Sequence, residues 1–143
     1  METLGLDTLN LRFQRQSGST LWLAQQCQAL PGIKEVNYTG LPQNPFHTLA
    51  TRQFGALHGA VFTISLASRE AAFSFIDRLR VICRATNLFD RKSLAIHPAS
   101  SIFASFTEAQ CRAMLVDDTL VRLSIGLEDP HDLLEDIKQA LGV

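Results

Sequence analysis

Side chains that could do chemistry are spread thinly along this sequence. The four histidines, His47, His58, His97 and His131, lie far apart, and no two of them form an HExxH pair. The chain also lacks a GxSxG nucleophile elbow, a phosphate-binding GxxxxGK[ST] loop and a GxGxxG turn. Spacing alone therefore indicates no self-contained catalytic centre, and each isolated histidine is predicted to be a surface or hydrogen-bonded structural residue.

The cysteines do not suggest a metal or disulfide framework either. Cys27, Cys83 and Cys111 are odd in number and widely spaced, with no CxxC pair and no histidine at the spacing of a zinc site. Free thiols are the prediction for all three.

The elements that must position any site follow from hydrophobic periodicity. Apolar residues between Leu4 and Leu30 recur mostly at helical spacing, which predicts one long helix, weakened around residues 17–19 and ended by Pro31 and Gly32. Five stretches rich in β-forming residues predict strands, at 33–38, 60–66, 81–85, 93–97 and 120–125. Further helices are predicted at 45–53, 69–79, 108–115 and 130–141. The last three are predicted to start at a Ser68 cap, at a capping box of Thr107 and Gln110, and at an Asp129 cap followed by Pro130. The pattern indicates one α/β domain, a sandwich of helices on a small sheet.

Bulk composition restricts the partners. The formal net charge is −1, and no block of like charge is present, so nucleic acid and anionic membranes are not expected partners. The longest apolar runs are far shorter than the roughly 18 residues that span a bilayer. No basic region followed by an apolar one marks the amino terminus. A soluble, cytoplasmic protein is expected.

Four short stretches carry a specific resemblance. Residues 93–100 (SLAIHPAS) and 120–129 (LVRLSIGLED) resemble hallmark segments of the pyridoxal-phosphate (PLP) enzymes of Cys/Met metabolism, in family order and at about family spacing. Residues 36–42 (VNYTGLP) resemble the family's strand and turn ending in Tyr-x-Gly-Leu, and residues 8–12 (TLNLR) resemble the start of its interdomain helix. The resemblance implies that residues 1–143 are the small C-terminal domain of such an enzyme, with residues 1–30 as the interdomain helix and the PLP-binding large domain absent. It also implies a mainly antiparallel sheet with helices on one face, as in fold-type-I PLP enzymes.

Two residues are implied to bind substrate. Arg122 matches the family's arginine for the α-carboxylate of the amino-acid substrate, and a planar guanidinium suits a bidentate carboxylate. Outside that motif, Arg122 would be interpreted as a surface arginine paired with Asp117 or Asp118. Asn87 occupies the position where many relatives hold the same carboxylate with a serine, and the competing interpretation is a turn residue that starts a loop.

Other motif residues are implied to shape the site. His97 and Ser100 are expected to be architectural, at the strand end and loop near the substrate entrance. Phe89 stands where relatives commonly have glycine, and His58 lies in a segment that is usually small and glycine-rich. The stretch 84–90 (RATNLFD) is more similar to the O-acetylhomoserine sulfhydrylases than to the cystathionine enzymes.

The family's cofactor lysine has no counterpart here. Lys34, Lys92 and Lys138 are the lysines of this chain, and none has the small-residue neighbours of the Schiff-base lysine. PLP is thus expected in the intact enzyme and not on this chain alone, which by itself is expected to be inactive.

The leading hypothesis is a domain of an O-acetylhomoserine sulfhydrylase-like enzyme, which carries out γ-replacement on an activated homoserine. Within the family, a cystathionine or methionine γ-lyase or a γ-synthase is the alternative. The alternative outside it is a non-enzymatic interaction module, or a split subunit that docks on a separate PLP-binding half. Family members are commonly oligomers, so self-association is a further expectation.

Overall fold

A computed structural model describes residues 2–143 of the chain, and the surroundings of side chains from residue 5 onward. The helices are α1 (Glu2–Asp7), α2 (Leu9–Cys27), α3 (His47–Phe54), α4 (Arg69–Arg78), α5 (Glu108–Ala113) and α6 (Pro130–Leu141), with a short 3₁₀ helix at Pro98–Ser100. The strands are β1 (Glu35–Asn37), β2 (Val61–Ser65), β3 (Cys83–Arg84), β4 (Leu94–Ile96) and β5 (Leu120–Ser124). Every predicted strand and helix is present, and most of the strands are shorter than predicted by a residue or two at each end.

The strands form one sheet in the order β1-β2-β5-β4-β3. β1 with β2, β2 with β5 and β5 with β4 are antiparallel, and only the edge pair β3 with β4 is parallel. The long central strands β2 and β5 pair from Val61 with Ser124 to Ser65 with Leu120. The expectation of a mainly antiparallel sheet is confirmed.

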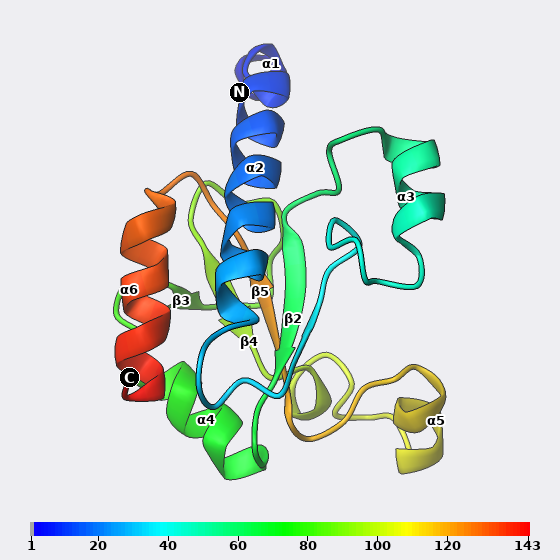
Figure 1. The fold of residues 1–143 in the computed structure, drawn as a ribbon, viewed down its shortest axis with the longest axis vertical. Helices are drawn as coiled ribbons and strands as arrows, with labels where there is room; N and C mark the ends of the chain where they lie inside the picture. Colours follow the sequence, from blue (N-terminus) through cyan, green and yellow to red (C-terminus); the bar gives the residue numbers. More distant parts are fainter. Residues whose placement is uncertain (1) are drawn as a thin grey trace.

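Helices α2, α4 and α6 cover one face of this sheet, as Figure 1 shows. The core lies between that helical layer and the sheet. Alternate residues of the two central strands point into it and are almost fully buried: Phe62, Ile64, Val121 and Leu123. Leu23 of α2, Phe75 of α4 and the pair Leu133 and Ile137 of α6 meet them there.

Three helix starts were predicted from local sequence and are confirmed. Ser68 accepts a hydrogen bond from the amide of Ala71 at the start of α4. Thr107 and Gln110 form a capping box at α5, and Asp129 precedes Pro130 as the cap of α6.

The lead helix, which was predicted as one helix between Leu4 and Leu30, differs from that prediction. A turn at Thr8 separates α1 from α2, whereas α2 runs without interruption through Ser17 and Ser19. Both serines are buried against the rest of the domain. Tertiary packing therefore outweighs the low helix propensity of this stretch.

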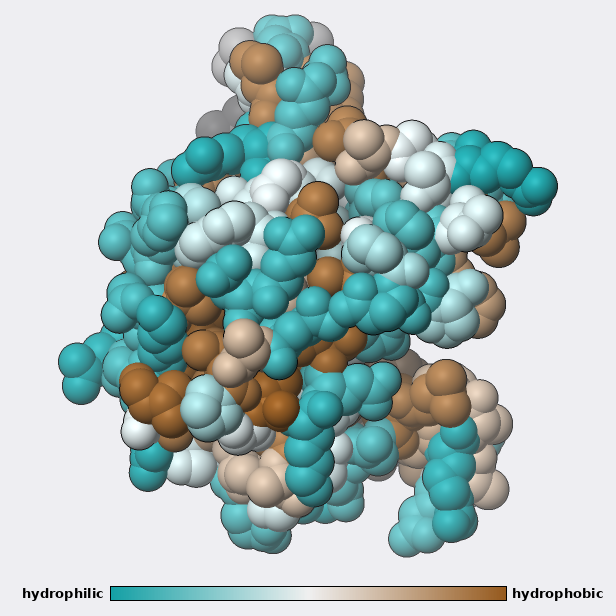
Figure 2. Space-filling view, viewed as in Figure 1, coloured by the Kyte–Doolittle hydropathy of each residue, from teal (hydrophilic) through white to brown (hydrophobic). Residues whose placement is uncertain are grey.

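Helix α1 and the first turn of α2 project beyond the body of the domain (Figure 1). Leu6, Leu9 and Leu11 are exposed there, and Figure 2 shows apolar surface at this projecting end among hydrophilic atoms. No helix within residues 2–143 is both long enough and apolar enough to cross a bilayer.

Candidate functional site

Arg122 lies in the middle of β5, on the sheet face opposite the helical layer. Its neighbours Val121 and Leu123 point into the core, so the alternation of a strand turns Arg122 the other way. It pairs with Thr63 on β2 and with Ile96 on β4, and Thr63 pairs in turn with Asn37 on β1. Arg122 therefore belongs to a row of side chains that crosses the open face of the sheet.

The guanidinium of Arg122 is held by main-chain oxygens and not by a carboxylate. Nη2 donates to the carbonyl oxygen of Thr86 at 2.8 Å. Nε is buried and has no hydrogen-bond partner within the described part of the chain. Burial lowers the pKa of Arg122 from its ordinary value, although an arginine keeps its charge at neutral pH. The site thus holds a fixed, half-buried cation with an unused donor.

The ion pair that would make Arg122 an ordinary surface arginine is not present. Asp118 pairs instead with Arg69 at 3.4 Å. Asp117 accepts hydrogen bonds from the amide and hydroxyl of Thr119, both at 2.7 Å. The interpretation of Arg122 as a partner of Asp117 or Asp118 is wrong, because both carboxylates have other partners.

Asn87 is exposed in the loop that follows β3, next to Thr86. Its carbonyl oxygen lies 3.5 Å from Nη2 of Arg122. Its side-chain amide donates to Asp90 at 3.4 Å. The structure therefore brings Asn87 and Arg122 together through the main chain of Asn87, while the amide takes part in the turn.

The loop of residues 86–92 is fixed to the rest of the domain by contacts that sequence reasoning missed. Gln16 on α2 is buried and donates to the carbonyl oxygens of Asp90 and Ile125, at 2.8 and 2.9 Å. Ser124 accepts a hydrogen bond from the amide of Phe89 at 3.2 Å. The only indication of these contacts in the sequence was the polar residue Gln16 among the apolar residues that recur at helical spacing in the lead helix.

Phe89 lies in the same loop as Asn87, and its amide is bound to Ser124, the last residue of β5. Its φ of 55° lies in the left-handed region that favours glycine. Its ring stacks on Phe13 of α2, with centroids 5.9 Å apart, and reaches Gly59, where an added Cβ would lie 3.8 Å from the ring. The loop is thus bulkier here than a glycine would make it.

A second set of hydrogen bonds ties the turn after β5 to the start of β4. Glu128 accepts from the amide and the hydroxyl of Ser93, both at 2.8 Å. The Ser93 hydroxyl accepts from the amide of Gly126. A Cβ at Gly126 would collide with the carbonyl oxygen of Arg91, so this position requires glycine. These bonds give a structural reason for Gly126 and Glu128 in the hallmark stretch of residues 120–129.

His97 and Ser100 lie where β4 ends. His97 is 4% exposed, and its Nδ1 accepts from the amide of Ser100 while its Nε2 donates to the carbonyl oxygen of Asp118 at 2.9 Å. The Ser100 hydroxyl lies 2.8 Å from Nδ1 of His97. The imidazole thereby joins the end of β4 to the segment that leads into β5, and neither residue contacts Arg122.

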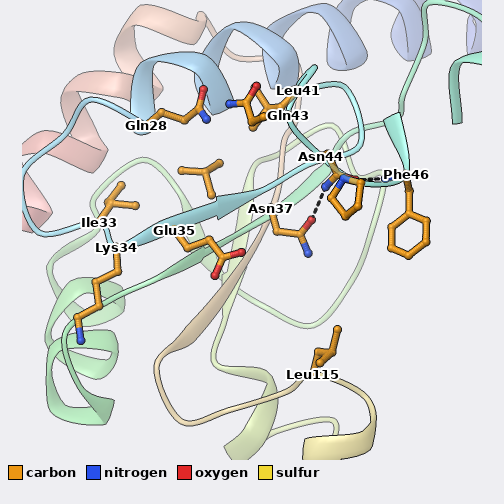
Figure 3. Close-up of a pocket in the computed structure, with 12 residues that line it drawn as sticks. Gln28, Ile33, Lys34, Glu35, Asn37, Leu41, Gln43, Asn44, Phe46 and Leu115 are labelled. Carbon is orange, nitrogen blue, oxygen red and sulfur yellow. Dashed lines mark hydrogen bonds between the residues drawn. The ribbon is translucent and has the colours of Figure 1, made fainter. Parts of the chain in front are cut away.

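A cavity lies away from Arg122, beside the edge strand β1 (Figure 3). Its volume is about 440 Å³. Side chains of β1, of the loop before α3 and of Leu115 line it, and Asn44 donates to Asn37 at 2.8 Å across it. It has no buried, unpartnered polar group to hold a ligand.

The three lysines do not fit a cofactor site. A Schiff-base lysine must present an uncharged amine beside the cofactor ring. Lys34 is exposed and donates to the carbonyl oxygen of Ala67, Lys138 pairs with Glu135 at 2.8 Å, and Lys92 is exposed. Within residues 2–143, no cluster of three or more histidine, cysteine or acidic side chains could hold a metal ion.

Comparison with known proteins agrees with the resemblance in the sequence. Residues 1–142 match the family model of the Cys/Met metabolism PLP-dependent enzymes. O-acetyl-L-homoserine sulfhydrylase 1 of Thermus thermophilus is 41% identical over 96% of this chain and 33% of its own length. Cystathionine gamma-lyase of Bos taurus is 37% identical over 96% of this chain and 34% of its own length.

A solved structure shows the same fold. The putative O-acetylhomoserine (thiol)-lyase of Campylobacter jejuni, which contains N'-pyridoxyl-lysine-5'-monophosphate, superposes with a TM-score of 0.93 and 32% identity. The match covers 98% of this chain and 34% of that one. The chain therefore spans about a third of the length of the relatives it matches. Together, the family model, the relatives and the fold show that this chain belongs to the Cys/Met metabolism PLP-dependent enzymes.

Proposed function

We propose that this chain is the C-terminal, substrate-capping domain of an O-acetylhomoserine sulfhydrylase-like enzyme, in which Arg122 binds the α-carboxylate of the amino-acid substrate. The observation that carries the proposal is the state of Arg122. It is a half-buried cation in the central strand with one main-chain acceptor at 2.8 Å, an unpartnered Nε and no carboxylate of its own. A substrate carboxylate would supply the acceptor that this donor lacks.

The surrounding residues would help to orient the substrate and would not take part in breaking its bonds. Thr86 and the main chain of Asn87 hold the guanidinium from one side, and Gln16 and Ser124 fix the loop that presents them. Phe89 would limit the space beside the carboxylate. His97 and Ser100 would keep an architectural role, because their hydrogen bonds bind one another and the main chain.

The cofactor would be bound by a part of the enzyme outside residues 1–143. PLP supplies an electron sink for the substrate's reacting carbons, and orientation of the substrate decides which bond is aligned with it. This chain contributes that orientation through Arg122. Titration of the purified chain with PLP, followed by borohydride, should leave Lys34, Lys92 and Lys138 without a stoichiometric adduct. A stoichiometric adduct on any one of them would contradict this division of roles.

The subfamily is supported by the stretch of residues 84–90, which is more similar to the O-acetylhomoserine sulfhydrylases than to the cystathionine enzymes. Sequence identity alone does not separate the subfamilies, because the Thermus sulfhydrylase and the cystathionine gamma-synthase of Mycobacterium bovis are both 41% identical to this chain. The test is a chimaera in which the PLP-binding portion of the Thermus relative precedes this chain. With PLP and sulfide, we expect faster turnover of O-acetyl-L-homoserine than of cystathionine or methionine. A chimaera that binds PLP but prefers cystathionine or methionine would indicate a γ-lyase or γ-synthase domain instead.

One observation favours a second candidate, a split subunit or non-enzymatic module that docks on another chain. Leu6, Leu9 and Leu11 are exposed on the projecting end of the lead helix. Mixing the purified chain with a separately expressed PLP-binding portion distinguishes the two. A stable complex by sedimentation supports docking of separate chains, and activity only in the covalent chimaera supports the single enzyme.

A further inference from the structure

Helix α3 has little packing of its own. Within His47–Phe54 only Ala50 is buried. Leu49, Phe54 and the preceding Phe46 are exposed, and Figure 1 shows α3 standing apart from α2, α4 and α6. The position of α3 therefore depends on a small number of contacts with the rest of the domain.

The contact between α3 and the start of β2 is a pair of imidazoles. The rings of His47, the first residue of α3, and His58, in the turn before β2, lie nearly parallel, with an interplanar angle of 13° and centroids 5.2 Å apart. His47 Nδ1 lies 2.8 Å from the carbonyl oxygen of Thr39, and His58 Nε2 lies 3.4 Å from the hydroxyl of Thr51 on α3. His58 thus touches α3 at two successive turns.

The hydrogen bonds define the neutral form of His47 but not that of His58, because the Thr51 hydroxyl beside His58 can either donate or accept. A carbonyl oxygen can only accept, so Nδ1 of His47 carries a proton. Nδ1 of His58 is buried and has no hydrogen-bond partner within residues 5–143. Protonation of His58 would place an N–H there with no acceptor, and would set its charge against that of a protonated His47.

Neighbouring groups offer no compensating negative charge. No carboxylate of the described residues lies within 4 Å of either ring's nitrogens. The one other charged side chain of α3, Arg52, is positive. Directly after β1, the ring of Tyr38 makes an edge-to-face contact with His58, with centroids 6.2 Å apart, and the Tyr38 hydroxyl donates to the carbonyl oxygen of Gly59. The turn 55–60 carries no charged side chain besides His58.

We infer that His47 and His58 form a proton-sensitive clasp, which fastens α3 to the start of β2 while His58 is neutral and releases α3 when both rings are protonated. The clasp is a property of this chain alone and does not rest on the proposed enzymatic role. Burial and the neighbouring His47 both lower the pKa of His58, in the direction that the geometry requires. The clasped state therefore holds fewer protons than the released state. It is fully stable above the ordinary histidine pKa of about 6.5 and loses stability as the pH falls through that value toward the lowered one.

The test is an NMR titration of the purified chain from about pH 8 to pH 5, a range that brackets ordinary histidine titration. Imidazole resonances report each protonation step, and heteronuclear NOEs of the backbone amides report the order of α3. We expect His58 to titrate below the ordinary histidine pKa of about 6.5, and α3 to lose order in the same pH range. Amides of α6 should not change and serve as the internal control. Titration of His58 at or above the ordinary value, or an α3 that stays ordered while His58 titrates, would overturn the clasp.

Two variants separate charge from packing. His58→Phe keeps an aromatic ring in the stack without a charge, so α3 should stay ordered across the whole range. His47→Gln keeps a donor for Thr39 but removes the facing charge, so the pKa of His58 should rise toward the ordinary histidine value of about 6.5. An H58F chain that still loses α3 at low pH, or an H47Q chain in which the His58 pKa does not move, would contradict the inference.

Discussion

Gln16 and Asp90 are joined by a hydrogen bond of 2.8 Å although 74 positions separate them in the sequence. The same side-chain nitrogen of Gln16 also donates to Ile125, at the end of β5. One buried amide therefore connects the lead helix, the loop that contacts Arg122 and the strand that carries Arg122. This connection fixes the position of the loop relative to the strand.

Gln16→Ala should lower the free energy of unfolding by about 1–3 kcal/mol, because two carbonyl oxygens lose a buried donor. Gln14→Ala is the matched control. Gln14 is an exposed glutamine on the same helix, and its substitution should change stability by less than about 0.5 kcal/mol. Urea denaturation followed by circular dichroism measures both. Equal losses for the two variants would show that the Gln16 amide has no special role.

Asp136 should be more important for stability than any acidic residue on the surface. Its carboxylate is 3% exposed and accepts from the amides of Arg80, Val81 and Ile82 at 2.8 to 2.9 Å. Asp136→Ala should cost about 3 kcal/mol or more, since three main-chain donors lose a buried, charged acceptor. Glu135→Ala, which removes only an exposed pairing with Lys138, should cost less than about 1 kcal/mol in the same denaturation experiment.

The backbone of Phe89 can be tested independently of its ring. Phe89→Gly and Phe89→Ala both remove the ring, but only alanine keeps a Cβ at a φ of 55°. We expect the glycine variant to be the more stable of the two by about 1 kcal/mol. At the neighbouring Leu88, which does not have a positive φ, the order should reverse, with alanine more stable by about 0.5–1 kcal/mol. The same order at both positions would mean that φ at Phe89 carries no cost.

The thiols should differ sharply in reactivity. Burial raises the pKa of Cys27 to about 12, so its reactive thiolate is scarce at any ordinary pH. Cys83 is exposed. In a timed reaction with iodoacetamide at pH 8, mass mapping should find Cys83 labelled first and Cys27 only after denaturation. Early labelling of Cys27 in the native chain would contradict the packing of α2.

Much of the fold could be predicted because local signals and burial agree. Apolar runs of five to seven residues marked β2 and β5, and the caps at Ser68, Thr107 and Asp129 marked helix starts. The turn at Thr8 and the continuity through Ser17 could not be predicted, since they depend on which part of the helix finds a partner.

The site was only partly visible in the sequence. Arg122 and Asn87 were predicted as site residues from the motif resemblance, and the structure places Nη2 of Arg122 3.5 Å from the carbonyl oxygen of Asn87. Gln16 and Ser124 were missed because their contacts join segments that only the folded chain brings together. The competing interpretation, in which Arg122 pairs with Asp117 or Asp118, could be excluded only from the structure for the same reason.

The proposed function depends most on Arg122. Kinetics of the chimaera with the PLP-binding portion of the Thermus relative test the role of Arg122 directly. We predict that Arg122→Ala lowers kcat/KM for O-acetyl-L-homoserine by about thirtyfold or more, as expected when a buried charge pair is broken, and that Arg122→Lys recovers only part of the loss. Arg78→Ala, an exposed arginine on α4, is the control and should leave kcat/KM unchanged. An R122A chimaera as active as the R78A control would contradict the assignment of Arg122 to the substrate carboxylate.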